Sequence, residues 1–231
     1  MIKGEKIRFE IHNILYSIYK LNKNLNDPSI KIKIEKNRSD DISLLNTVTL
    51  NSMRYNFHTT NIINKYVKKK LRGHQKILLQ SAITQIIYLN FKEYAVVNCS
   101  VEIAKKLKIH PGFINAVLKK IIKNKKILKD KKISFKDLPE WFKLNTKFFT
   151  KYEKDIFLKN FAKEPDIHLV FKDKIKFQKF EEKLIKTSDY SGFLAEKKYI
   201  KEIKSYNEGY WWVQDFSSFF PLYNLPLKYQ N

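Results

Sequence analysis

Side chains able to do covalent chemistry are few in this sequence. The only cysteine, Cys99, could supply a thiolate, but no activating base stands beside it, so we interpret it as a small residue on a half-buried helix. One cysteine forms no disulfide within the chain, which fits a reducing compartment. The histidines are scattered without the spacing of metal ligands, so no metal site is predicted: His12, His58, His74, His110 and His168.

An aromatic run offers another chemistry, stacking on nucleic-acid bases. It consists of Tyr210, Trp211 and Trp212, in a stretch with strand character. Aromatic residues on strands usually pack, so we favour core packing over base stacking. Gln214 and Asp215 follow this run. They could contact RNA, but a helix cap is the preferred interpretation.

Lysines gather in two runs that could hold phosphates. The first run comprises Lys65, Lys68, Lys69, Lys70, Arg72 and Lys76. The second comprises Lys119, Lys120, Lys123, Lys125 and Lys126. A lone lysine is usually just solvated, but two runs that flank one core favour a phosphate-binding face. Such lysines would supply affinity and salt dependence, whereas RNA sequence is usually read on unpaired bases.

The whole chain is strongly basic. Its 231 residues include 46 Lys and Arg against 23 Asp and Glu, which gives a net charge of +23. A charge of this size indicates the partner rather than the fold, with nucleic acid first and an anionic membrane surface second. The N-terminus lacks the apolar segment of a signal peptide, and no apolar stretch reaches the length of a membrane span. We therefore expect a soluble, cytoplasmic protein with no membrane partner.

The elements that must position these side chains centre on residues 77–89. Their apolar residues cover most of the circumference of a helix, so both sides should be buried by other helices. We expect those helices over residues 6–22, from Asp40 or Asp41 onward, and over 60–70, 95–107 and 113–128. Residues 22–38 are predicted to form a loop, and the lysine-rich residues 119–136 a solvated helix end and a linker.

The second half of the chain has a different pattern. A helix that begins at Leu138-Pro139 and another over residues 152–162 should form a connector. Strands are expected over 166–171, within 191–203 and over 209–213, with a helix over 174–184. A last helix from Gln214-Asp215 should bury Phe219, Leu222 and Leu225. We therefore predict a mainly α protein, with a helical bundle over 1–136, a helical connector over 137–163 and a small α+β region over 164–231.

Two stretches of the helical bundle resemble NusB-like RNA-binding domains. The first is the central helix, LQSAITQIIYL at residues 79–89. The second is the pairing of AVVNCSVEIA at 95–104 with GFINAVL at 112–118. The resemblance implies that the bundle is a NusB-like domain that binds RNA.

The order of the later blocks is similar to the RsmB (Sun) family of bacterial 16S ribosomal RNA cytosine-5 methyltransferases. These blocks are LPEW at 138–141, EPDIHL at 164–169 and GYWWVQDFSS at 209–218, of which WVQD is the most specific. In that family a NusB-like domain precedes a small RRM-like domain and then a catalytic domain. The resemblance covers nearly the whole chain and implies that residues 164–231 are an incomplete RRM-like, pre-catalytic region.

The same resemblance implies S-adenosylmethionine as the cofactor of the full-length family. It also implies two catalytic cysteines, one that attacks C6 of cytosine and one that helps release the product. The glycine-rich cofactor loop should follow Leu225, whereas the five glycines here are isolated, and Cys99 matches neither cysteine motif. We therefore assign no catalytic and no cofactor-binding residue, and we expect this chain to be a truncated or frameshifted part that is inactive alone.

Three interpretations stay open. The first is the RNA-binding region of an RsmB-like methyltransferase, with ribosomal RNA as its partner. The second is a stand-alone NusB-like protein in transcription antitermination or ribosomal RNA processing, with a ribosomal protein as a further partner. The third is a basic helical protein whose charge reflects genome composition, which predicts RNA affinity without preference.

Overall fold

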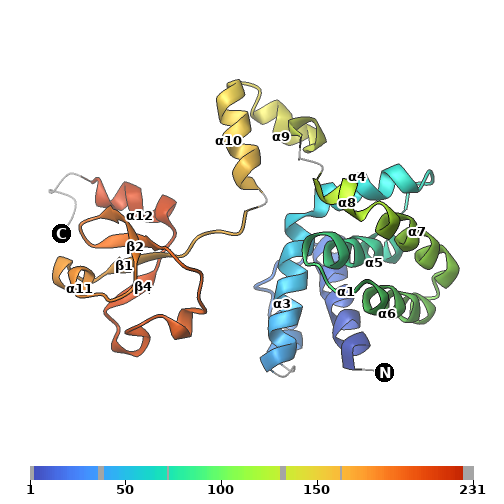
Figure 1. Cartoon of the computed structure of the whole chain (residues 1–231), viewed down its shortest axis with the longest axis horizontal. Helices are drawn as coiled ribbons and strands as arrows, with labels where there is room; N and C mark the ends of the chain where they lie inside the picture. Colours follow the sequence, from blue (N-terminus) through green and yellow to red (C-terminus); the bar gives the residue numbers. More distant parts are fainter. Residues whose placement is uncertain (1–2, 36–38, 72, 131–133, 162, 226–231) are drawn as a thin grey trace. The chain divides into compact units, whose positions relative to one another are not determined.

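The computed structural model describes residues 3–35, 39–71, 73–130, 134–161 and 163–225. The chain divides into two compact units, Met1–Ala162 and Lys163–Asn231. The first unit is helical and the second contains the sheet (Figure 1). The predicted fold class, a mainly helical bundle followed by a small region with a sheet, is thus confirmed.

The bundle is built around α5 (His74–Ile83). This helix packs against α1 (Lys3–Leu21), α3 (Ser39–Arg54), α4 (Asn56–Tyr66), α6 (Glu93–Lys106) and α7 (Pro111–Lys123) (Figure 1). Every residue from Ile77 to Ile87 is buried, as the apolar pattern on both sides of the helix predicts. The central position predicted for residues 77–89 is therefore confirmed.

The last turn of this central helix is wider than an α-helix. Residues Thr84–Tyr88 form a π-helix, in which the N–H of Leu89 donates to the carbonyl of Thr84. The buried Thr84 hydroxyl donates back to the carbonyl of Gln80 at 2.9 Å. The wider turn carries the side chain of Gln85, whose Oε1 accepts from Nε of Arg8 on α1 at 2.6 Å. One polar contact thereby ties the N-terminal helix to the centre of the bundle.

A short helix, α2 (Pro28–Glu35), replaces part of the loop predicted over residues 22–38, so that prediction was wrong. Asp27 is the reason, because its Oδ1 accepts from the backbone N–H of Ser29 at 2.9 Å, as a cap does. Pro28 then stands at the first helical position, where its missing N–H costs nothing. Ile30 is fully buried against the core and anchors the helix.

Several predicted helix limits also differ from the structure. Helix α3 begins at Ser39, so Asp40 and Asp41 lie within its first turn instead of before it. Helix α4 covers Asn56–Tyr66 instead of residues 60–70, and the described residues that follow, 67–71 and 73, are not helical. The predicted helix over 113–128 is broken at Asn124 into α7 and α8 (Lys125–Asp130). Leu128 of α8 is buried in the core, so this segment is more than a solvated linker.

The connector helices are α9 (Glu140–Asn145) and α10 (Lys151–Phe161), preceded by a short 3-10 helix at Phe135–Asp137. Pro139 precedes α9 instead of standing in its first turn. The rings of Phe142 and Phe157 stack at 4.8 Å between centroids and hold the two helices together. The boundaries 1–136 and 137–163 stay a prediction.

The second unit is a four-stranded antiparallel sheet with strand order β2-β3-β1-β4. Its strands are β1 (His168–Phe171), β2 (Leu184–Ser188), β3 (Ser191–Leu194) and β4 (Trp211–Val213). Its helices are α11 (Lys174–Gln178) and α12 (Phe216–Tyr223), with 3-10 turns at Ile200–Glu202 and Tyr206–Glu208. Leu169 and Phe171 pack on one face with Trp211, whereas His168 on the other face contacts rings of α12.

Two predictions for this unit were wrong, and one was confirmed. The helix predicted over 174–184 ends at Gln178, and Leu184 instead begins β2, opposite Leu194 of β3. One strand lies within residues 191–203, where one or two were expected, and the 3-10 turn follows it. Phe219 is buried as predicted, but Leu222 and Leu225 are exposed.

A chain of hydrogen bonds crosses this sheet. The Nδ1 of buried His168 lies 2.9 Å from the carbonyl of Gln214, which only accepts, so Nδ1 must carry the proton. Its Nε2 therefore accepts from the hydroxyl of Thr187 at 2.9 Å. Thr187 accepts in turn from Ser191, which lies 2.6 Å from Ser188. Each of the three hydroxyls in this hydrogen-bond network therefore has a partner, as buried polar groups require.

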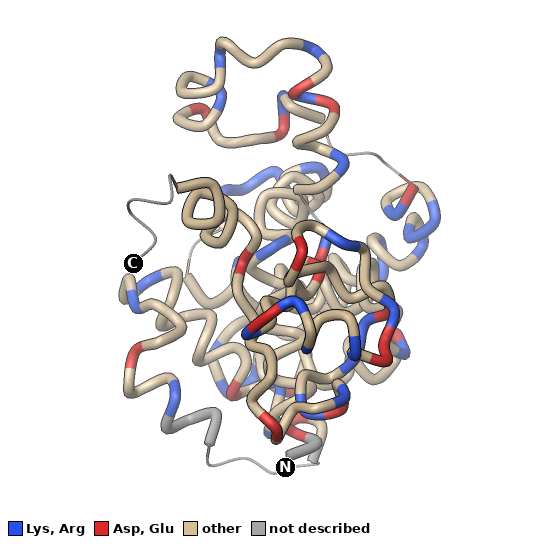
Figure 2. Tube along the Cα trace, turned by 90° about the vertical axis from the view of Figure 1, so that its left-hand side faces the viewer, with Lys and Arg blue, Asp and Glu red and all other residues tan. Residues whose placement is uncertain are grey.

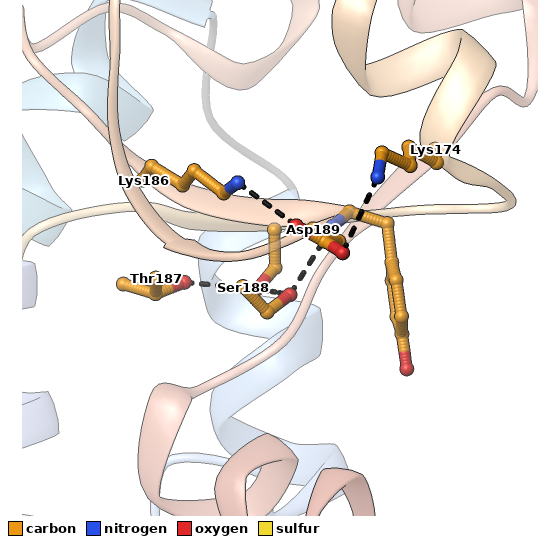
Figure 3. A network of polar contacts seen from close by, with 7 residues as sticks. Lys174, Lys186, Thr187, Ser188 and Asp189 are labelled. Atoms are coloured by element: carbon orange, nitrogen blue, oxygen red, sulfur yellow. Dashed lines mark hydrogen bonds and ion pairs between the residues drawn. The ribbon is translucent and has the colours of Figure 1, made fainter.

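Charged side chains also meet at the turn between β2 and β3. Asp189 lies between two amines, Lys186 at 2.9 Å and Lys174 at 3.5 Å (Figure 3). The hydrogen bond from Lys186 and the charge of Lys174 lower the pKa of the Asp189 carboxyl. Exposed pairs of this kind contribute little stability, so we assign Asp189 to the turn and not to a binding site.

Candidate nucleic-acid interface

The segment between α4 and α5 positions the first lysine run. Helix α4 ends at Tyr66, and the chain then turns through Lys68, Lys69 and Lys70 to Gly73. Gly73 has φ +55° and ψ −133°, a conformation that residues with a Cβ rarely adopt. This turn brings the lysines of the segment next to Lys76 in the first turn of α5.

These residues line a cavity of about 290 Å³, which we call the lysine cavity. Its walls come from α4, the connecting segment and α5: Thr60, Ile63, Asn64, Val67, Lys68, Lys69, Lys70, Leu71 and Lys76. Lys68, Lys69 and Lys70 are exposed, whereas Lys76 is half-buried. Among the residues that the structure describes, none of these four lysines forms an ion pair with a carboxylate.

The electrostatics of the cavity favour an anion. Burial lowers the pKa of Lys76, and the charges of Lys20 and Lys70 lower it further. Three ammonium groups therefore repel one another around one half-buried position. An anion placed among them would relieve this repulsion and would also receive hydrogen bonds from the amines. The volume is large enough for a phosphate group.

Lys20 is a candidate that the sequence did not identify. It stands in the last turn of α1, far from the first lysine run in the sequence, and only the packing of α1 on α5 brings it near Lys76. The other predicted members of the first run divide. Lys65 is exposed on α4 but does not line the cavity, and Arg72 lies outside the described residues.

The second lysine run occupies a separate position. Lys119, Lys120 and Lys123 are exposed on α7, and Lys126 is exposed on α8. Lys125 is half-buried and forms an ion pair with Glu93 at 3.0 Å, which fastens α8 to the start of α6. None of the five lines the lysine cavity. The structure therefore describes one concave basic site and one exposed basic helix end, and their joint use stays a prediction.

Two histidines that the sequence separates meet between α1 and α5. The Nε2 of buried His12 lies 2.9 Å from Nδ1 of His74, and the ring of Tyr16 stacks on His74 at 4.1 Å. Burial and the charge of His74 lower the pKa of His12 to about 4. His12 is therefore neutral at pH 7, and the pair joins α1 to the start of α5.

Within the described residues, no group of three or more His, Cys, Asp and Glu side chains is placed to hold a metal ion.

Cys99 is half-buried on α6, as expected for a small helix residue. Its Sγ lies 4.0 Å from a guanidinium nitrogen of Arg8, whose Nε is engaged by Gln85.

Charge is distributed along the described helices with basic positions in excess (Figure 2). In the described segments, no helix combines the length and the apolar character needed to cross a bilayer.

The aromatic run divides between core and surface. Trp211 is buried, and its Nε1 donates to the carbonyl of Lys204 at 2.8 Å. Tyr210 packs partly against the same core, beneath the amine of Lys176. Trp212 is 46% exposed, so the predicted core packing is right for Trp211 and wrong for Trp212. Asp215 precedes α12, but its carboxylate accepts from the hydroxyl of Ser217 and makes no capping bond to a backbone N–H.

Comparison with known proteins relates this fold to others. One match is a solved structure of the antitermination factors NusB and NusE in complex with dsRNA, with 21% sequence identity and a TM-score of 0.48. The match covers 53% of this chain and 98% of the chain in that structure. A structure of PH0851 is 13% identical with a TM-score of 0.50. It covers 96% of this chain, which in turn spans only 55% of PH0851. Among curated proteins, no sequence matches this chain significantly.

A family model gives the clearest assignment. The model of the NusB family matches residues 6–123, which is more than half of the chain. The match begins in α1 and ends at Lys123, the last residue of α7, so it covers the bundle around α5. This chain therefore belongs to the NusB family.

Proposed function

We propose that the NusB-family domain of this chain binds RNA through the lysine cavity. The observation that carries the proposal is the gathering of Lys68, Lys69, Lys70 and Lys76 around one cavity, with no carboxylate partner in the described part of the chain. Lys20 adds to the same positive field. Cations without counter-ions around a pocket of phosphate size are typical of sites that hold a nucleic-acid backbone.

The distribution of charge supports a polyanion over a single small anion. Residues 163–231 hold 12 lysines and 10 acidic residues, so they carry +2 of the net charge of +23. Residues 1–162 carry the other +21. One phosphate needs only two or three of these charges, whereas an RNA strand uses many along its length. The exposed lysines of α7 and α8 would extend the contact with the backbone.

We further propose ribosomal RNA as the partner, with the chain serving as the RNA-binding part of an RsmB-like cytosine-5 methyltransferase in the cytoplasm. The support is the block order after residue 136, WVQD above all. The likeness to PH0851 is a second support, because it covers 96% of this chain and so extends beyond residues 6–123, which the NusB family model matches. The alternative, a stand-alone protein in antitermination or ribosomal RNA processing, is supported by the NusB family match itself.

RNA affinity measured over a range of salt concentrations tests the lysine cavity. A variant with Lys68→Ala, Lys70→Ala and Lys76→Ala should bind more weakly, and the slope of log affinity against log salt should fall by about one for each phosphate that the variant no longer binds. The matched control replaces three exposed lysines of the sheet unit with alanine: Lys179, Lys183 and Lys201. Its net charge therefore equals that of the cavity variant. Equal affinity and slope in the two triple variants would contradict the cavity as the site.

The choice of RNA separates the interpretations. Crosslinking of the full chain to cellular RNA, followed by sequencing of the bound fragments, should enrich one region of 16S ribosomal RNA if the RsmB-like proposal holds. Enrichment of leader transcripts would favour the antitermination alternative. Binding that is spread over all transcripts and disappears at modest salt would support the third interpretation, a charge without a specific partner.

A further inference from the structure

The sheet unit has a cavity of a different kind. It measures about 790 Å³ and lies between the end of α12 and the strands β1 and β4. Trp212 and Tyr190 contribute aromatic walls from the sheet side, and Phe219 and Tyr223 contribute them from the helix. We call this the aromatic cavity. It belongs wholly to the sheet unit, whose charge is nearly balanced.

The aromatic rings of this cavity are held in place by their neighbours. Trp212 pairs with Val170 across the β1–β4 ladder, and its Nε1 donates to Oε1 of Gln214 at 3.0 Å. Tyr223 lies edge-on to Tyr190 at 5.6 Å and stacks on Phe219 at 5.4 Å. Trp212 nevertheless leaves 46% of its surface exposed. An exposed indole in a fixed orientation is ready to accept a flat ring without a large loss of side-chain entropy.

Polar groups stand at the edge of the same cavity. Lys172 lines it with an exposed amine that forms no ion pair within the described residues. The Oε1 of Gln214 is occupied by Trp212, which leaves the two N–H groups of that amide without an acceptor among the described side chains. Aromatic walls with amide and amine donors at the edge match a planar ligand that carries hydrogen-bond acceptors on its rim.

We propose that the aromatic cavity binds an unpaired base of the RNA strand, with the base stacked on Trp212 and its edge read by Gln214 and Lys172. The inference rests on the proposed RNA binding of the helical unit and adds a second contact of another type. The lysine cavity holds phosphates without regard to sequence, whereas the aromatic cavity contacts a base. A base in a duplex is already stacked between its neighbours, so this site selects single-stranded RNA.

The near balance of charge in the sheet unit decides between an RNA base and other ligands. A site that held the backbone would need several cations, and among the described cavity residues only Lys172 is charged. An apolar ligand would leave the amide of Gln214 and the amine of Lys172 without partners, at a cost in free energy. A base needs no cluster of cations, because its ring stacks on Trp212 without charge. The nitrogen and oxygen atoms at the edge of the base can accept hydrogen bonds from Gln214 and Lys172.

The test compares a short single-stranded oligoribonucleotide with the same sequence in a duplex, both binding to the full chain. Trp212→Ala should weaken binding of the single strand roughly 5- to 100-fold and leave binding of the duplex unchanged. The slope of log affinity against log salt should stay as in the wild type, since the lysines that bind phosphates are all still present. Tyr199→Ala is the matched control, because Tyr199 is an exposed aromatic of the same unit that does not line the cavity.

A second measurement does not depend on the stability of the Trp212 variant. In a Trp141→Phe background the remaining tryptophans, Trp211 and Trp212, both lie in the sheet unit. Single-stranded RNA should quench this fluorescence, and the quenching should disappear when Trp212→Phe is added. Wild-type affinity in Trp212→Ala together with unquenched fluorescence would overturn the inference while leaving RNA binding by the lysine cavity intact. Failure of the wild type to bind either RNA would overturn both.

Discussion

At the scale of single residues, the side chains most sensitive to change are polar groups buried among apolar ones. Gln80, His12 and His168 lie in the interior, and each is held by partners from other elements. His12 differs from the other two because it can take up a proton. Its Nε2 bonds to His74, and its Nδ1 has no hydrogen-bond partner among the described residues. Protonation would therefore place an uncompensated charge in the core.

This position makes the stability of the helical unit depend on pH. The pKa of His12 falls from 6.5 in the unfolded chain to about 4 in the folded one, so between these values the unfolded state binds more protons. The contribution of neutral His12 to the free energy of unfolding is fully present above pH 6.5. It is lost as the pH falls toward 4, by up to about 3 kcal/mol. We predict that urea unfolding of His12→Gln shows a smaller loss over this range than the wild type.

The comparison needs a variant of the same helix without a change in titratable groups. Asn13→Gln is suitable, because Asn13 is the neighbour of His12 on the half-exposed side of α1. It should keep the full pH dependence of the wild type. If His12→Gln and Asn13→Gln lost the same free energy of unfolding between neutral and acid pH, another group would be responsible.

At the scale of elements, Gln80 fastens α4 to α5 and so supports the lysine cavity. Its Nε2 donates to Oδ1 of Asn56 at 2.5 Å and to the hydroxyl of Thr60 at 3.0 Å, from a side chain that is 3% exposed. We predict that Gln80→Met, which has a similar shape, lowers the free energy of unfolding by about 1–3 kcal/mol, because both acceptors lose their donor.

Circular dichroism during urea unfolding measures this change in stability. Gln75→Met serves as the control, since Gln75 lies on the same helix, is half-exposed and makes no side-chain hydrogen bond within the described residues. The control should change stability by less than about 0.5 kcal/mol. Equal losses of stability in the two variants would mean that the hydrogen bonds of Gln80 do not account for the effect of Gln80→Met.

The same scale shows how far the sequence predicts the elements. The helices α1, α5 and α6 were predicted because periodic apolar residues require burial, and the packing satisfies them. Helix α2 was missed because Asp27-Pro28 signals both a turn and a capped helix start, and only the burial of Ile30 decides between them. The end of α7 at Asn124 follows from the packing of Leu128, which apolar spacing alone does not show.

The candidate sites divide in the same way. Lys68, Lys69, Lys70 and Lys76 were predicted together because a short segment joins them, so neighbours in sequence are neighbours in space. Lys20 was not predicted, because its approach depends on how α1 crosses α5. Trp212 was assigned to the core because strand aromatics usually pack. It lies instead on an edge strand, and the place of a strand within a sheet depends on long-range pairing.

At the scale of the whole molecule, the two units differ in what stabilises them. The bundle has a continuous apolar core around α5, whereas the sheet unit is small and depends on Trp211, Phe171 and the hydrogen bonds of His168. Small units bury a lower fraction of their surface and are correspondingly less stable. We therefore predict two separate unfolding transitions, with the sheet unit unfolding at the lower urea concentration.

Two probes can follow the units independently. Far-UV circular dichroism reports mainly on the helices of the bundle, and tryptophan fluorescence in a Trp141→Phe background reports on Trp211 and Trp212 of the sheet unit. His168→Ala leaves the hydroxyl of Thr187 without its acceptor and the carbonyl of Gln214 without its donor, which costs about 2–4 kcal/mol. The fluorescence transition should therefore move to lower urea while the main dichroism transition stays in place. Gln80→Met should do the reverse, and a joint shift of both probes in either variant would mean that the two units fold as one.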